Sequence, residues 1–166
     1  MQPIEVLLIE DNPGDAFLVR LILAESQTPV RVHLAQDGME ALLILASDVV
    51  HPDLIIVDLN LPHISGHQVM ERYRQNDIPV VVFSSSWDDE DRRRALALGA
   101  REFVRKPLGA QEYRAAVCAM VDKWALRREQ PAPAGPAQYQ RAEPKSKRTR
   151  PTARKSSGKY STQNAT

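Results

Sequence analysis

The chain contains very little cysteine and no long apolar segment. Cys118 is the only cysteine among 166 residues, so a disulfide bond within the chain is excluded, and its apolar flanks are typical of a small core residue. No apolar run approaches the ~18 residues that a membrane span requires. The N-terminal residues 1–5 lack the basic stretch and apolar core of a signal peptide. These absences predict a soluble cytoplasmic protein without a membrane partner.

Charge is divided unevenly along the chain. The chain has 22 Lys/Arg and 21 Asp/Glu residues. Residues 130–166 hold eight of the basic residues and one of the acidic residues, so residues 1–129 hold 14 basic and 20 acidic residues. Residues 130–166 are also rich in proline and serine and have too few apolar side chains to offset the entropy of ordering. We therefore predict one folded domain at 1–129 and a disordered basic tail at 130–166.

Residues 4–129 alternate short β-rich apolar runs with amphipathic stretches, which is typical of repeated βα units around a parallel sheet. The sequence predicts a doubly wound α/β fold with five strands and five helices. The expected strands are Ile4–Ile9, Val30–Leu34, Leu54–Val57, Val80–Phe83 and Glu102–Arg105. The expected helices are Asp15–Glu25, Met39–Ser47, Gly66–Gln75, Asp89–Leu98 and Ala110–Arg128. In the first helix, Phe17, Leu18, Leu21 and Ile22 recur at helical spacing and predict its buried face.

Charged residues follow three of the predicted strands directly. Glu10 and Asp11 follow the first strand, Asp58 follows the third, and Lys106 follows the fifth. Since the carboxyl ends of parallel strands meet at one edge of the sheet, where such folds bind their ligands, the sequence predicts a site there.

This set of residues is suited to phosphoryl chemistry. An aspartate such as Asp58 can attack phosphorus and form an acyl phosphate if the repulsion between carboxylate and phosphoryl oxygens is offset. Mg²⁺ prefers oxygen ligands, which Asp11 and Asp58 supply, with Glu10 binding directly or through water. Lys106 can neutralise a phosphoryl oxygen as a point charge, and Ser84 offers a hydroxyl at the end of the fourth strand.

Residues 4–128 resemble the receiver domain of bacterial two-component response regulators. The resemblance rests on five ordered motifs, namely Leu7–Pro13, Asp37–Leu42, Asp58–Pro62 with Gly66, Pro79–Ser84, and Phe103–Pro107, together with Leu98–Ala100. It implies a flavodoxin-like (βα)5 fold with strand order 2-1-3-4-5.

The same resemblance assigns roles to single residues. Asp58 would be the phosphoacceptor, Glu10 and Asp11 the acid pocket, and the Asn60 carbonyl a ligand of Mg²⁺ or Mn²⁺. Ser84 and Lys106 would bind the phosphoryl group, and Ser84 with the aromatic residue Phe103 would form the conformational switch. Glu10 departs from the aspartate of many receiver domains.

The resemblance also implies partners and a mode of action. The protein would be a stand-alone signalling switch, not a conventional enzyme, and would catalyse its own phosphorylation and dephosphorylation. A sensor histidine kinase would supply the phosphoryl group, and the motif Glu10–Asp15 looks most like regulators that serve phytochrome-type kinases. A homodimer through the fourth helix, fifth strand and fifth helix is expected, because Tyr113, Val117, Met120 and Trp124 form a stripe along the last helix.

Plainer interpretations exist for several of these residues. Asp58 could cap a helix, Lys106 could lie on the surface before a turn, and Phe103 could be ordinary core. Asp15 fits the start of a helix better than a ligand. The four histidines, His33, His51, His63 and His67, share no metal-ligand spacing, which indicates solvated or loop positions.

One alternative function belongs to a different class. The basic tail could bind nucleic acid through its eight positive residues in a salt-dependent way. The tail has no helix-turn-helix pattern, zinc site or repeated aromatic platform, so the signalling switch is the preferred interpretation.

Overall fold

The computed structural model describes residues 2–47, 49–73 and 77–125, all of which lie in one compact unit, Met1–Pro131. The predicted tail at 130–166 and the expected last turn of the fifth helix lie outside the described residues. No helix of the described residues is long and apolar enough to cross a membrane. Strands and helices alternate in the order β1 (Ile4–Ile9), α1 (Pro13–Ala24), β2 (Val30–Ala35), α2 (Gly38–Ala46), β3 (Leu54–Val57), α3 (Gly66–Arg72), β4 (Val80–Ser84), α4 (Asp89–Ala97), β5 (Glu102–Arg105) and α5 (Ala110–Trp124).

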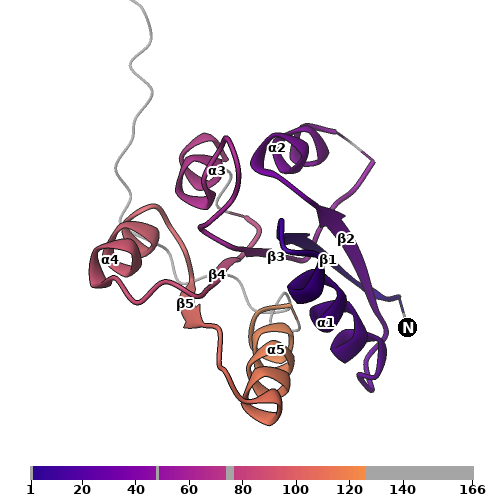
Figure 1. Ribbon diagram of the computed structural model, residues 1–166. Coiled ribbons are helices and arrows are strands. Elements are labelled where there is room, and N and C mark those ends of the chain that lie inside the picture. The colour runs from indigo at the N-terminus through magenta and orange to yellow at the C-terminus, as the bar shows by residue number, and fades with distance from the viewer. Residues whose placement is uncertain (1, 48, 74–76, 126–166) are drawn as a thin grey trace, which may run out of the picture. The chain divides into compact units, whose positions relative to one another are not determined.

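The five strands form one parallel sheet in the order β2-β1-β3-β4-β5 (Figure 1). This order confirms the predicted doubly wound α/β fold. In the central pairs Ile9 lies beside Val57, and Val57 beside Val82, so β1, β3 and β4 end close to the same level. The order reverses between β1 and β3, and this is where open α/β sheets place their ligand crevice.

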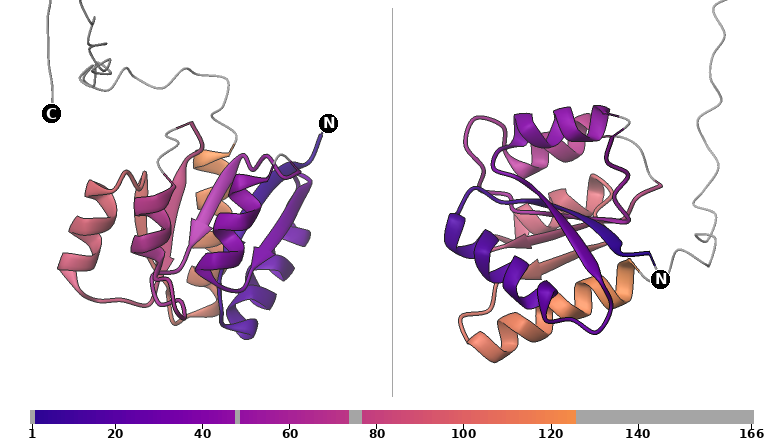
Figure 2. Two further views of the ribbon diagram at one scale, coloured as in Figure 1. Left: turned by 90° about the horizontal axis from the view of Figure 1, so that it is seen from above. Right: turned by 90° about the vertical axis from the view of Figure 1, so that its right-hand side faces the viewer.

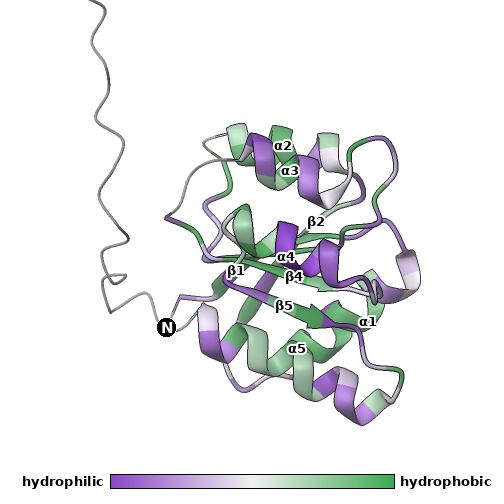
Figure 3. Cartoon of the chain, turned by 90° about the vertical axis from the view of Figure 1, so that its left-hand side faces the viewer, coloured by the Kyte–Doolittle hydropathy of each residue, from purple (hydrophilic) through white to green (hydrophobic). Residues whose placement is uncertain are grey.

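Helices cover both faces of the sheet. Helices α1 and α5 lie together on one face, while α2, α3 and α4 cover the other (Figures 1 and 2). Each face has its own apolar cluster, because alternate residues of the central strands point to opposite sides. Strand β3 is buried at all four positions, as a strand covered on both faces must be. In Figure 3, β4 is mainly green (hydrophobic), whereas β5 also carries purple (hydrophilic) segments.

Local capping fixes the start of the helices next to the site. Asn12 caps α1 by accepting hydrogen bonds from the backbone nitrogens of Gly14 (2.8 Å) and Asp15 (3.1 Å). Pro13 occupies the first helical position, where its missing N–H costs no hydrogen bond. Helix α1 therefore begins two residues before its predicted start at Asp15.

Two apolar stripes, one in α1 and one in α5, do not pack as the sequence predicts. In α1, Phe17 is 67% and Leu21 is 42% exposed, and the buried residues are Ala16, Val19, Ile22 and Leu23. In α5, the predicted dimer stripe faces inwards, where Tyr113, Val117 and Met120 join the core. Trp124 is half-buried and donates a hydrogen bond from Nε1 to Glu102 Oε2 at 2.7 Å. The stripe of α5 is therefore core and not a dimer surface.

Candidate phosphorylation site

Backbone hydrogen bonds continue past the strand ends and bring the predicted residues together. The backbone nitrogen of Asp58 donates to the Ile9 carbonyl at 3.0 Å, and that of Lys106 donates to the Ser84 carbonyl at 2.9 Å. The backbone nitrogen of Glu10 donates to the Ala35 carbonyl at 3.0 Å. Asp58, Lys106 and Glu10 consequently lie at one edge of the sheet, as predicted.

Asp58 is 5% exposed, and both of its carboxylate oxygens accept hydrogen bonds. Oδ1 accepts from Ser84 Oγ at 2.7 Å and from the backbone nitrogen of Asn60 at 3.1 Å. Oδ2 accepts from Lys106 Nζ at 2.7 Å. A helix cap would bond to backbone amides alone, so the contacts from Ser84 and Lys106 favour the functional interpretation over the plainer one.

The Lys106 side chain is only 8% exposed, and its ammonium group donates to three carboxylates. These are Glu10 Oε2 at 2.6 Å, Asp15 Oδ2 at 2.7 Å and Asp58 Oδ2 at 2.7 Å. Burial alone would lower the pKa of Lys106, but the bonds to these three carboxylates outweigh it and raise the pKa above its ordinary value. Lys106 therefore stays charged, and it is not the surface lysine of the alternative interpretation.

Glu10 is 3% exposed and is the most deeply placed acid of the site. Its Oε1 accepts a hydrogen bond from the backbone nitrogen of Asn12 at 3.1 Å. Burial raises the pKa of Glu10, and the bond from Lys106 lowers it only in part. The site thus holds a carboxyl group that ionises less readily than a solvated glutamate.

Some predicted site residues lie farther out. Asp11 and Asn60 are exposed, and Phe103 is half-buried and packs against the apolar cluster below α2, α3 and α4. Within residues 2–47, 49–73 and 77–125, no group of three His, Cys, Asp or Glu side chains is placed to hold a metal ion.

The donors nonetheless fit a hard cation. Glu10 and Asp58 direct carboxylate oxygens at the same point, which the positive Lys106 ammonium occupies. Carboxylate oxygens of this kind are ligands that Mg²⁺ and Mn²⁺ prefer.

Asp15 joins this cluster of charged side chains, which the sequence did not predict. It was predicted only to start a helix, yet its carboxylate contacts Lys106 at 2.7 Å. A signal existed, because Asp15 lies in the first turn of α1, four residues after Asp11, at the end of the helix that begins next to the sheet edge.

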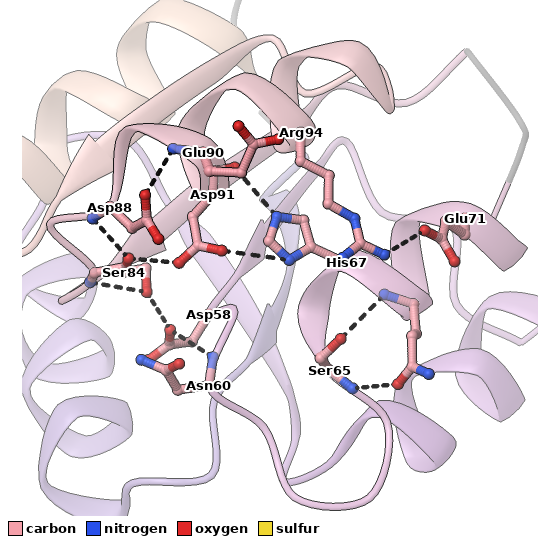
Figure 4. A network of polar contacts seen from close by, with 12 residues as sticks. Asp58, Asn60, Ser65, His67, Glu71, Ser84, Asp88, Glu90, Asp91 and Arg94 are labelled. Carbon is pink, nitrogen blue, oxygen red and sulfur yellow. Dashed lines mark hydrogen bonds and ion pairs between the residues drawn. The ribbon is translucent and has the colours of Figure 1, made fainter.

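A chain of polar contacts leads away from Asp58 towards α4 and α3 (Figure 4). The backbone nitrogen of Ser86 donates to Ser84 Oγ at 3.4 Å, and Ser86 Oγ donates to Asp91 Oδ2 at 2.6 Å. His67, in α3, has its Nε2 3.1 Å from the Asp91 carbonyl oxygen. His67 is 5% exposed, so the prediction of a solvated or loop histidine is wrong at this position: α4 covers the first turn of α3.

Known proteins share this fold and part of this sequence. The phosphorylated cyanobacterial phytochrome response regulator RcpA is 30% identical, with a TM-score of 0.70 over 74% of this chain and 94% of RcpA. The Mn²⁺-bound response regulator Rcp1 is 28% identical, with a TM-score of 0.71 over 78% of this chain and 100% of Rcp1.

Among curated sequences, the probable methanogenesis regulatory protein FilR2 of Methanothrix harundinacea is 29% identical over 80% of this chain and 90% of FilR2. Several other curated relatives are longer, and the chain spans between 12% and 51% of their length. The sequence profile of the response regulator receiver domain matches residues 6–118, which is more than half of the chain. The chain therefore belongs to the receiver domain family of two-component response regulators.

Proposed function

We propose that this protein accepts a phosphoryl group from a sensor histidine kinase on Asp58, and that the phosphorylated form signals through altered protein contacts. The observation that carries the proposal is the Asp58 carboxylate, which is buried at a strand end between Ser84 Oγ at 2.7 Å and Lys106 Nζ at 2.7 Å. In the transfer, an Asp58 oxygen bonds to phosphorus while the phosphorus–nitrogen bond of a phosphohistidine breaks, and its electron pair leaves with the imidazole.

The residues around Asp58 would act mainly through position and charge. Phosphoryl transfer has a loose transition state with charge on the equatorial oxygens. The Lys106 ammonium and the Ser84 hydroxyl already contact the acceptor carboxylate, so each can donate to those oxygens after a small movement. Glu10, Asp11, Asp58 and the Asn60 carbonyl would hold Mg²⁺ or Mn²⁺, which when bound offsets the repulsion between the carboxylate and the phosphoryl group.

Ser84 and Phe103 would report the phosphorylated state, and the protein would also catalyse its own dephosphorylation. If Ser84 Oγ turns to a phosphoryl oxygen, its bond to Asp58 Oδ1 is lost and its 3.4 Å contact with Ser86 changes. Ser86 contacts Asp91 in α4, so a change at Ser84 reaches the surface of the domain.

The test is phosphorylation of the full chain by acetyl phosphate, followed by intact mass. We expect the mass of one added phosphoryl group with Mg²⁺ and none with a chelator. Asp58→Asn should remove the acceptor, while Asp122→Asn, on the exposed side of α5, should behave as wild type. A phosphoryl group on the Asp58→Asn protein would refute the assignment.

The kinase partner is proposed to be of the phytochrome type. The support is the likeness to RcpA, a cyanobacterial phytochrome response regulator. Phosphotransfer profiling with a phytochrome-type kinase and unrelated sensor kinases tests this directly. Faster transfer from an unrelated kinase would contradict the phytochrome assignment without affecting the role of Asp58.

We also propose that the domain forms a homodimer through the α4, β5 and α5 face. Support comes from apolar side chains exposed around α4 and after β5, namely Trp87 (74%), Leu96 (40%) and Leu108 (101%). Light scattering with and without phosphorylation tests this, with Leu96→Glu as the disrupting variant. A monomer mass for wild type at high micromolar concentration would contradict it.

A further inference from the structure

The Lys106 ammonium group uses all of its hydrogen-bond donors inside the site. An ammonium group has three N–H donors and no acceptor. Those of Lys106 go to three different elements: Glu10 after β1, Asp15 in α1 and Asp58 after β3. Because the side chain is 8% exposed, water competes little for these bonds.

The three carboxylates differ in burial and in what else they do. The side chains of Glu10 and Asp58 are 2% and 6% exposed and, in the proposed function, bind the metal and the phosphoryl group. The Asp15 side chain is 33% exposed and stands in the first turn of α1, outside both of those tasks.

We propose that Asp15 is a positioning residue that keeps the Lys106 ammonium over the phosphoacceptor. The inference rests on the proposed function and deepens it. Glu10 and Asp58 must change partners when metal and phosphoryl group arrive, whereas Asp15 can keep its bond to Lys106 throughout. Asp15 also draws part of the lysine charge away from Glu10 and Asp58, which leaves their oxygens freer to bind a cation.

The first measurement concerns Lys106 itself and needs neither metal nor phosphate. In full-length protein labelled with ¹⁵N-lysine, the Lys106 ammonium should give a proton–nitrogen signal, because it is buried and bonded on all sides. Asp15→Ala removes a charge-assisted bond, so we expect its protons to exchange with water about tenfold faster. Asp15→Asn keeps an acceptor of the same length and should give an intermediate rate.

The second measurement separates positioning from a structural role at the helix start. Asp15→Ala should slow phosphorylation by acetyl phosphate about tenfold in the wild-type background, and by less than about twofold in the Lys106→Ala background. A role in helix stability alone would give the same loss in both backgrounds. Glu112→Ala removes an acidic residue from the first turn of α5 and serves as the matched control, with an unchanged rate.

The outcomes are distinguishable from failure of the proposed function. Unchanged ammonium exchange in Asp15→Ala, or equal rate losses in both backgrounds, overturns the role of Asp15. If wild type takes up no phosphoryl group, the proposed function fails, and ammonium exchange alone then decides whether Asp15 holds Lys106. If Lys106→Ala takes up none, the same exchange measurement decides.

Discussion

Gly66→Ala should both destabilise the domain and damage the phosphorylation site. Gly66 begins α3 where the helix meets the segment after β3, and its backbone nitrogen donates to the Leu59 carbonyl at 3.1 Å. A Cβ at position 66 would collide with the Asp58 carbonyl oxygen and lie 2.9 Å from Leu59 Cα. Real Cβ atoms essentially never come under 3.0 Å, and here the obstacles are backbone atoms that cannot rotate away.

The magnitude follows from two opposing terms. Overpacking in a close-packed region costs about 1–3 kcal/mol. Replacing glycine returns about 0.4–1 kcal/mol by restricting the unfolded chain. Because the obstacles are backbone atoms, we take the upper part of the overpacking range, about 2–3 kcal/mol, and expect the free energy of unfolding to fall by about 1–2.5 kcal/mol. Because the displaced atoms belong to Asp58 and Leu59, phosphorylation by acetyl phosphate should slow as well.

Urea denaturation measures the effect as a lower midpoint at constant slope. Gly14→Ala is the matched control, because its Cβ would meet only the Asn12 side-chain oxygen at 3.1 Å, and its stability should stay within about 0.5 kcal/mol of wild type. An unfolding free energy of Gly66→Ala equal to or above that of wild type would refute the packing argument.

Three further predictions follow from the site and its surroundings. Lys106→Ala should still take up some phosphoryl group, since the lysine makes no bond to phosphorus. It should lose the change in Trp87 fluorescence that phosphorylation induces in wild type. A fluorescence change as large as in wild type would contradict the role of Lys106 in the switch. Burial raises the pKa of Glu10 above its ordinary 4.5, so its favourable contribution is complete below that pH and is lost as pH rises through the folded value. Glu10→Gln should therefore gain stability relative to wild type as the pH rises above 4.5 in urea titrations, and a constant or falling difference would contradict the raised pKa. Tyr113→Phe should raise the free energy of unfolding by up to about 1 kcal/mol, because the buried Tyr113 hydroxyl has no hydrogen-bond partner within the described residues. The substitution keeps the edge-on contact with the Phe83 ring, whose centroid lies 5.1 Å away. A loss of more than about 1 kcal/mol in urea denaturation would show that the hydroxyl makes a hydrogen bond after all.

The sheet could be predicted from the sequence because its signals are local and repeated. The run Leu54–Val57 is apolar at every position, as is typical of a parallel strand covered on both faces. Once the strands are parallel, their carboxyl ends share an edge, which places Glu10, Asp58 and Lys106 together without knowledge of any side-chain conformation.

Helix faces were predicted less well because apolar spacing alone does not identify the partner surface. In α1, Phe17 and Leu21 belong to an apolar set at helical spacing but are exposed, and the smaller Ala16 and Val19 face the sheet. In α5, the stripe with Val117 reads equally well as core or as a dimer surface. Both faces depend on the distance between helix and sheet, which no local pattern contains.

Within the site, the position of Lys106 could be predicted from the sequence, but its hydrogen-bond partners could not all be predicted. The backbone hydrogen bond from Lys106 to Ser84 fixes where the side chain starts, so its place at the sheet edge follows from the fold. The position of its ammonium group is set by charge instead. Four rotatable bonds let Nζ reach any acceptor nearby, and Nζ lies among three carboxylates that come from three different parts of the fold. Asp15 could therefore be found only once α1 was placed against the strand ends. Its effect on chemistry should appear only through Lys106, which is why the two substitutions have to be combined.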